Sequence, residues 1–333
     1  MNKISYKNIQ GVSLTAGIVK KMIRAVKWIF FQGISPVWIK RSFLHLNAIL
    51  TVPLNRVAVD AITIEPGLTS DVVYCPRSVK NNGVILYFHG GGFEIGSPFT
   101  HRYFAGLLAR ETGYPIILPD YRLAPENPFP AAAHDAVSAY QYLLNAFPPD
   151  RIILAGDSAG GGLVIELLAQ IKQKKHPFPQ AAVLLSPWAD LALHSESISA
   201  NRRNDPILSR SWLLKAAKHY AGGSSYGEVS PLNRDMEGFP PLFVQTGGAE
   251  ILLDDSKRLV DKASSKGVDI QLDVWAGCWH VWQMYPFVPE ARLAIQDIAN
   301  FTRAAINRAQ SEKKGGGLEE LLGSCGSGKK KER

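Results

Sequence analysis

From residue 57 onward, short apolar runs alternate with longer stretches in which apolar residues recur every three or four positions. The short runs are rich in β-branched residues and end at Gly, Pro or Asp, which is typical of buried strands. Strands that alternate with helices indicate an α/β fold: a mostly parallel sheet with helices on both faces. The runs are VAVDAITI, DVVYC, GVILYFHG, YPIILPD, RIILAG, AAVLLSP, PLFVQTG and VDIQLDVWAG.

The stretches between the runs carry the helical patterns that such a fold requires. The first two runs are close together and predict an antiparallel edge of the sheet. Four later gaps contain the patterns HRYFAGLLARET, AAHDAVSAYQYLLNAF, LVIELLAQIKQ and ILLDDSKRLVDKASSKG. The gap between AAVLLSP and PLFVQTG contains one clear pattern, SRSWLLKAAKHYAG, and is too long for a simple crossover. It predicts an insertion above the sheet.

An amphipathic helix is predicted over residues 14–31, LTAGIVKKMIRAVKWIFF. One face carries Leu14, Ile18, Met22, Val26 and Ile29 or Phe30, with Lys20, Lys21, Arg24 and Lys27 interspersed. Two interpretations are open. The favoured one packs the helix over the rest of the protein, where it could act as a lid; the other is a helix at a membrane surface.

Composition and charge exclude several classes of protein. With 333 residues and 46% hydrophobic content, the chain can bury a sizeable core. Its net charge of +8 comes in good part from KKMIRAVK near the start and KKKER at the end, with no basic stripe between them, so we expect no nucleic-acid partner. No segment has the length of a membrane span, and no signal peptide is recognisable, so we expect no stable membrane insertion and a cytoplasmic protein.

Cysteine usage agrees with a reducing compartment. Cys75, Cys278 and Cys325 are odd in number, far apart and without Cys-x-x-Cys spacing. Neither a disulfide framework nor a zinc site is indicated. We therefore expect no metal and no organic cofactor.

The candidate chemistry centres on the segment RIILAGDSAGGG, in which a Gly-x-Ser-x-Gly pentapeptide joins a predicted strand to a predicted helix. The pentapeptide alone is weak evidence for a catalytic serine. Its position strengthens the case, because a nucleophile elbow needs a strand-to-helix junction with small residues such as Gly156 and Gly160. Ser158 would then need a base and an orienting acid. His280, in the loop after the last predicted strand, is better placed than His134 or His219, which lie in helical patterns.

A second glycine-rich segment, HGGGF, follows the run GVILYF. Consecutive glycines leave backbone amides free to point at a developing oxyanion. A phosphate-binding loop is disfavoured, because GGGFEIGS lacks the lysine that such a loop requires.

At five motifs the chain resembles the hormone-sensitive-lipase-like carboxylesterases, a family of α/β-hydrolases. The motifs are HGGGF, DYRLAPENPFPAA, GDSAGG, SPW with DL two residues on, and HVW, spread in order across residues 57–305. The resemblance implies that Ser158 is the nucleophile, that His280 is the base, and that the amides of Gly91, Gly92 and Ala159 form the oxyanion hole. It also implies a lid from the N-terminal helices.

The catalytic acid is where the chain departs from this family, which usually carries Asp followed by Pro-Leu and a second acid. Here the segment reads GGAEILLDDS. Alignment of the leucines assigns Glu250 as the catalytic acid and Asp254 as the second acid. Glu250 also follows the run PLFVQTG directly, whereas Asp254 and Asp255 lie at a helix start, where carboxylates cap free amides. We therefore favour Glu250.

These observations predict three parts: a helical cap over residues 1–50, a catalytic α/β-hydrolase domain over 51–310 with an inserted cap at about 190–238, and a tail over 311–333 that is unstructured or an expression remnant. The expected function is hydrolysis of a small carboxylic ester, short- to medium-chain in its acyl part, through an acyl-enzyme. A non-catalytic receptor like the plant gibberellin receptors, and an acyltransferase, are the alternatives, and a homodimer is left open. Aromatic residues that either line an apolar pocket or simply pack are Trp28, Phe30, Phe31, Trp38 and Phe43.

Overall fold

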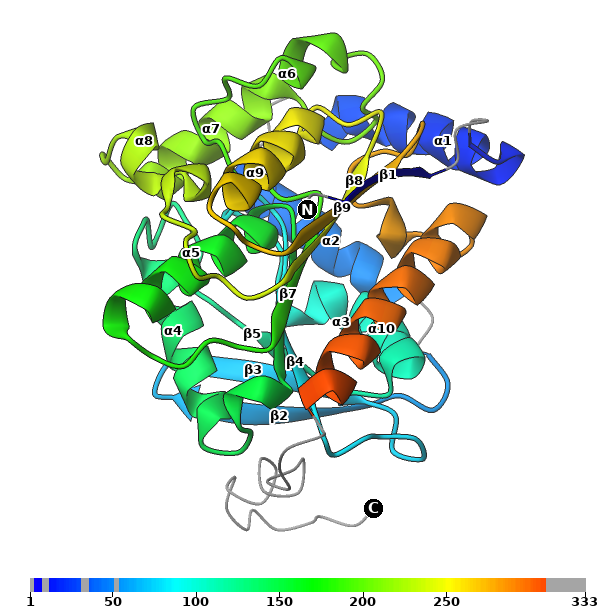
Figure 1. The fold of residues 1–333 in the computed structure, drawn as a ribbon. Coiled ribbons are helices and arrows are strands. Elements are labelled where there is room, and N and C mark those ends of the chain that lie inside the picture. Colours follow the sequence, from blue (N-terminus) through cyan, green and yellow to red (C-terminus); the bar gives the residue numbers. More distant parts are fainter. Residues whose placement is uncertain (1–2, 8–11, 31–35, 51–53, 310–333) are drawn as a thin grey trace.

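A computed structural model describes residues 3–7, 12–30, 36–50 and 54–309 (Figure 1). Within them lies one nine-stranded sheet of order β1-β9-β8-β7-β6-β4-β5-β3-β2. Its strands are β1 (Lys3–Lys7), β2 (Ala58–Glu65), β3 (Leu68–Tyr74), β4 (Val84–Phe88), β5 (Ile116–Pro119), β6 (Ile152–Asp157), β7 (Ala181–Leu185), β8 (Leu242–Gly247) and β9 (Ile270–Trp275). The predicted tail over 311–333 and the aromatic Phe31 lie outside the described residues, as do the side chains of Trp28 and Phe30.

The predicted sheet topology is confirmed. Strands β4 to β9 pair in parallel, while β2 pairs with β3, and β3 with β5, in antiparallel register. The central strands are buried throughout, which explains why they read as continuous apolar runs instead of alternating ones.

Helices cover both faces of this sheet, as the alternating pattern predicts. Figure 1 shows α4, α5 and α9 on one face and α3 and α10 on the other, and each set buries its own apolar cluster against the strands. The helices are α1 (Leu14–Phe30), α2 (Val37–Leu50), α3 (Pro98–Thr112), α4 (Ala131–Leu144), α5 (Ala159–Lys174), α6 (Ser197–Ala200), α7 (Arg210–Ala221), α8 (Tyr226–Val229), α9 (Leu253–Ser265) and α10 (Pro289–Ala309). None of those described is long and apolar enough to cross a bilayer.

Besides the short helices α6 and α8, strand β1 and helix α10 were not predicted from the sequence. Strand β1 adds to the edge of the sheet in parallel with β9. Helix α10 packs on β7 and β8 through apolar residues at helical spacing, among them Ile295, Ile298 and Ile306. That spacing was a readable signal for α10, whereas a five-residue strand such as β1 is too short to be recognised by periodicity.

Helix α1 is present as predicted, but the prediction of which of its faces packs against the protein is wrong. Ala16 and Val19 are buried against an aromatic cluster that includes Trp275 and Trp279, while Leu14, Ile18 and Met22 point to solvent. The physical reason is that small side chains let the helix approach bulky indole rings closely, so the less apolar-looking face makes the tighter contact.

Residues 190–238 contain α6, α7 and α8. Helix α7 packs into the core through residues such as Trp212 and Ala216. The Tyr220 ring, at the end of α7, stacks on Phe93 with a centroid distance of 3.7 Å and an angle of 12°. This stretch is therefore fastened directly beside the HGGGF segment.

Candidate active site

The candidate residues converge because they follow parallel strands at the same edge of the sheet. Ser158 comes directly after β6, Glu250 shortly after β8, and His280 shortly after β9. The carboxyl ends of neighbouring parallel strands meet at one edge, which is where ligand sites of open α/β sheets form. All three side chains are buried.

The backbone at Ser158 has φ 52° and ψ −120°, a strained conformation for a residue with a side chain. Two glycines make this turn possible. A Cβ at Gly160 would lie 2.0 Å from the carbonyl oxygen of Phe88, and one at Gly156 would lie 2.5 Å from that of Gly160. Helix α5 begins at Ala159, so its N-terminus faces the serine and favours negative charge there.

His280 connects the serine to the acid. Its Nε2 lies 2.9 Å from Ser158 Oγ, and its Nδ1 lies 3.7 Å from Glu250 Oε2. Burial acts to lower the pKa of His280, but the Glu250 carboxylate, together with Asp205 and Asp157, acts in the opposite direction, and the net result is a raised pKa. The imidazole is thus a stronger base than burial alone would allow.

Glu250 is fully buried and is held by two hydroxyls that were not predicted as site residues. Ser186 Oγ donates to its Oε2 and Thr246 Oγ1 to its Oε1, each at 2.7 Å. Ser186 also accepts from the amide of Val281, next to the histidine, at 3.2 Å. The serine of the SPW motif was a signal for Ser186, since it follows β7 at the same edge of the sheet.

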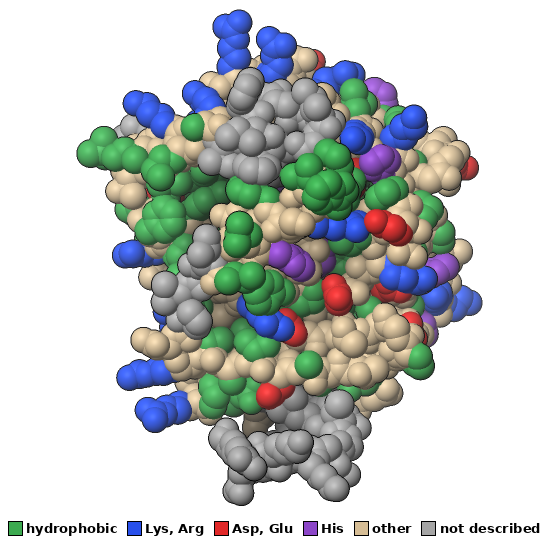
Figure 2. Space-filling view, turned by 180° about the vertical axis from the view of Figure 1, so that it is seen from behind, with side chains coloured by type: hydrophobic (Ala, Val, Ile, Leu, Met, Phe, Trp, Pro, Cys, Tyr) green, Lys and Arg blue, Asp and Glu red, His purple; other side chains and the backbone are tan. Residues whose placement is uncertain are grey.

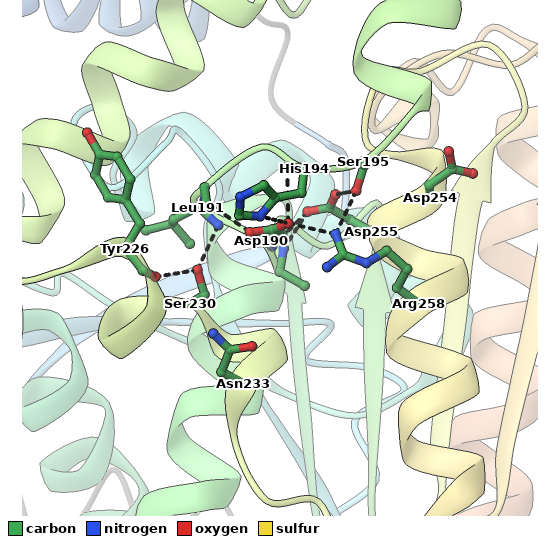
Figure 3. Close-up of polar contacts among 12 residues, drawn as sticks. Asp190, Leu191, His194, Ser195, Tyr226, Ser230, Asn233, Asp254, Asp255 and Arg258 are labelled. Carbon is green, nitrogen blue, oxygen red and sulfur yellow. Dashed lines mark hydrogen bonds and ion pairs between the residues drawn. The ribbon is translucent and has the colours of Figure 1, made fainter.

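Asp254 and Asp255 lie elsewhere, and their predicted role as caps of their own helix is wrong. Asp254 accepts from the amide of Ser197 at 2.8 Å and pairs with Lys257 at 3.1 Å. Asp255 accepts from the amides of Ala189 and Asp190, at 3.0 and 2.9 Å. Figure 3 shows Asp255 turned into the network around Asp190, with Asp254 pointing away from it.

Asp254 and Asp255 do not cap α9 because the loop between β7 and α6 brings backbone amides to the start of that helix, and the two carboxylates accept from these amides. Burial raises the pKa of Asp255 to about 6, although the Ser195 hydroxyl and the two amides oppose that rise. The two carboxylates therefore fasten this loop, and neither pairs with His280.

The three backbone amides predicted to face an oxyanion follow β6 and β4, two neighbouring parallel strands. Ala159 follows Ser158, and Gly91 and Gly92 lie in the loop after β4, both at positive φ (123° and 64°). In the described part of the chain, none of these amides donates to a protein acceptor. Free amides at the amino end of α5 and in the glycine loop suit a developing negative charge.

Asp157 anchors the glycine loop. Its Oδ1 accepts from the Gly90 amide at 2.9 Å and from the Tyr87 hydroxyl at 2.8 Å. His89 lies next to this contact, and burial, together with nearby His101, lowers its pKa to about 3, so its ring stays neutral at pH 7. Sequence reasoning gave Asp157 no role of its own.

A buried charge cluster links the same loop to both predicted caps. Glu94, two residues after Gly92, accepts from Trp212 Nε1 at 3.1 Å and contacts His219 Nδ1, both from α7. From α2, the Lys40 ammonium lies 3.9 Å from the Glu94 carboxylate. His219, predicted as a surface or packing residue, thus belongs to a polar cluster behind the glycine loop.

The serine and the histidine expose little of their surface. Ser158 and His280 are 6% and 4% exposed, and a cavity of about 360 Å³ lies away from them, between α3 and α10, beside Tyr103, Arg110 and Phe287. Trp38 does not line an apolar pocket, since it is 68% exposed.

Known proteins match this chain over most of its length. A family profile described as the α/β hydrolase fold matches residues 85–284. An acetyl-hydrolase of Streptomyces hygroscopicus is 38% identical over 251 residues, which cover 73% of this chain and 84% of that protein. An esterase of Acinetobacter venetianus is 41% identical over 223 residues, covering 66% and 74%.

A solved structure agrees with these matches. The crystal structure of an esterase from the bacterial hormone-sensitive lipase family superimposes with a TM-score of 0.82 at 38% sequence identity. The superposition covers 88% of this chain and 99% of that one.

Proposed function

Because the chain belongs to the hormone-sensitive-lipase-like esterases of the α/β hydrolase fold, we propose that it hydrolyses small carboxylic esters through an acyl-enzyme on Ser158. It is a carboxylic ester hydrolase; the residues, the mechanism and a preference for short- to medium-chain acyl groups are the proposal. The observation that carries it is the 2.9 Å separation of His280 Nε2 from Ser158 Oγ at the strained turn.

Neutral His280 accepts the Ser158 proton while Oγ attacks the ester carbonyl, and the imidazolium then protonates the leaving alcohol. Glu250 lies on the far side of the ring, where its carboxylate favours the tautomer with the proton on Nδ1 and stabilises the positive imidazolium. Water, activated by the same histidine, releases the acid and restores Ser158.

The oxyanion of the tetrahedral intermediate is stabilised by the amides of Gly91, Gly92 and Ala159. Their lack of protein acceptors in the described residues supports this role, as does the positive end of α5. Asp157 positions the glycine loop through the Gly90 amide.

Within the predicted 1–50 cap, β1 belongs to the sheet instead; helices α1 and α2, together with about residues 190–238, form the cap over the serine. The buried contacts of Glu94 with α2 and α7 support this assignment, because they fasten both segments to the glycine loop. His280 lies within hydrogen-bond distance of Ser158, which disfavours the alternative of a receptor that has lost catalysis. The acyltransferase alternative would use the same acyl-enzyme, with an alcohol in place of water as the acceptor.

The test is hydrolysis of nitrophenyl esters of increasing acyl length by the protein and by Ser158→Ala. We expect activity that is greatest for short and medium chains, and a loss on the order of 10⁴ to 10⁶ in kcat in the variant. A variant that folds and keeps most of its rate would exclude Ser158 as the nucleophile.

A further inference from the structure

Exposed apolar side chains are concentrated on the two N-terminal helices. Of the ten large hydrophobic side chains that are exposed in the described part of the chain, six lie on α1 and α2. On α1 these are Leu14, Ile18 and Met22, which are 83%, 53% and 65% exposed. Their spacing of four residues aligns them in one stripe along the helix.

Helix α2 carries a matching stripe. Trp38, Leu46 and Ile49 are 68%, 56% and 67% exposed, and their spacing of eight and three residues again places them on one side of the helix. The opposite side of α2 holds buried Lys40. Both helices therefore pack through one side and present a second apolar side outward.

The stripe on α1 is not needed for packing. Ala16 and Val19 already fill the contact with the aromatic cluster below the helix. Large apolar side chains in contact with water contribute no hydrophobic stabilisation. Exposed apolar patches of this kind mark interaction surfaces.

The charge of the same segment indicates the partner. Residues 1–59 contain nine Lys or Arg and no Asp or Glu, whereas the remaining chain has 28 basic and 29 acidic residues. The entire excess of positive charge thus belongs to the segment that carries the two stripes. Lys21 is exposed directly beside the α1 stripe, and Arg24 fastens the helix to the carbonyls of residues 203 and 204.

We propose that this surface docks the protein on an anionic lipid surface. The N-terminal face is defined by the exposed side chains of Leu14, Ile18, Lys21, Met22, Trp38, Leu46 and Ile49. Its apolar stripes enter the boundary between head groups and acyl chains, and its cations lie at the acidic head groups. In Figure 2, hydrophobic side chains gather in the upper left of the face shown, with lysine and arginine side chains at their margin.

A helix that is apolar on its exposed side and carries lysines but no acidic residue fits an anionic lipid surface better than it fits water. Tryptophan, here Trp38, is favoured at the interface because its ring is apolar and its indole N–H is polar. Docking would place lipid against the predicted cap itself, because α1 and α2 belong to it. Helix α2 connects this cap to the loop of Gly91 and Gly92: Lys40 lies beside the Glu94 carboxylate, and Arg41 donates to the Glu94 backbone carbonyl.

The test is cosedimentation of the full chain with vesicles of phosphatidylcholine, alone or with about one third phosphatidylglycerol. We expect binding to the anionic vesicles only, and weaker binding at about 0.5 M salt. The triple variant Leu14→Ser, Ile18→Ser, Met22→Ser should lower the partition coefficient at least about tenfold. Lys21→Gln should lower it about fivefold.

A matched control separates this face from exposed apolar residues in general. Phe287 and Leu293 are 54% and 50% exposed near and on α10, so Phe287→Ser with Leu293→Ser should leave binding unchanged. Ser158→Ala should also bind like the unchanged protein, because docking does not depend on the proposed catalysis. Thermal unfolding of each variant shows that it is folded.

Three results would overturn the proposal. The first is no sedimentation with anionic vesicles, and the second is equal binding to neutral ones. The third is a dimer in light scattering that the triple variant converts to a monomer, which would assign the N-terminal face to a second copy of the chain.

Discussion

The Lys40 ammonium of α2 lies 3.9 Å from the carboxylate of Glu94, and neither side chain is exposed to solvent. Burial lowers the pKa of Lys40, while Glu94 opposes this effect. The ammonium also lies 5.5 Å from the centroid of the Trp212 ring, and Trp212 itself donates to Glu94. One buried charge pair therefore connects α2, α7 and the loop of Gly91 and Gly92.

Glu94→Gln should lower the free energy of unfolding by about 3 kcal/mol, because it leaves a buried ammonium without its counter-charge. The double variant Lys40→Met, Glu94→Gln should be more stable than Glu94→Gln alone. Urea unfolding measures both differences. Equal stabilities for the single and double variants would mean that the ammonium left without Glu94 costs no stability, which contradicts this reason.

Glu250→Gln should reduce kcat about 10⁴-fold, since the amide can stabilise neither the required imidazole tautomer nor the imidazolium. Asp254→Asn should keep most of its rate and lose at most about 1 kcal/mol of stability, because Asp254 contacts Ser197 and Lys257 and not the histidine. Steady-state kinetics of the two variants tests the assignment. An active Glu250→Gln beside an inactive Asp254→Asn would move the catalytic acid to Asp254.

The acidic limb of kcat/KM should have its midpoint above pH 6.5, because Glu250 raises the pKa of His280 despite burial and only the neutral ring accepts the serine proton. Activity should therefore fall as the pH drops through this raised pKa. In Glu250→Gln, burial dominates and the pKa of His280 should drop. An NMR titration of His280 in both proteins checks the direction, and an unchanged pKa would contradict the contact.

Gly160→Ala should destabilise the protein by at least about 2 kcal/mol and reduce activity, because its Cβ would lie 2.0 Å from the carbonyl oxygen of Phe88. Gly17→Ala is the matched control. Gly17 lies inside α1 with no atom within 4 Å of an added Cβ, so alanine there should be neutral or stabilise the helix by about 0.5–1 kcal/mol. Thermal unfolding and the esterase assay compare the two, and equal effects would contradict the close approach of α5 to β4.

Much of the fold could be read from the sequence because its signals are local. Buried parallel strands appear as continuous apolar runs, and the glycines of the GDSAG segment mark a turn that no larger residue fits. Ser158, His280 and Glu250 each follow one of these runs, so their meeting at one edge of the sheet was predictable from the parallel direction of the strands. Their catalytic roles stay predictions.

Tertiary structure decided what no local pattern contains. The spacing of α1 is apolar on two sides, and only contact with Trp275 and Trp279 determines that Ala16 and Val19 point inward and Leu14 outward. Likewise, no local pattern in GGGFEIGS indicates that Glu94 is buried, because its partners Lys40 and His219 come from α2 and α7, far away in the chain. Side-chain partners from distant segments determine which polar groups are buried, because burial is favourable only where those partners meet.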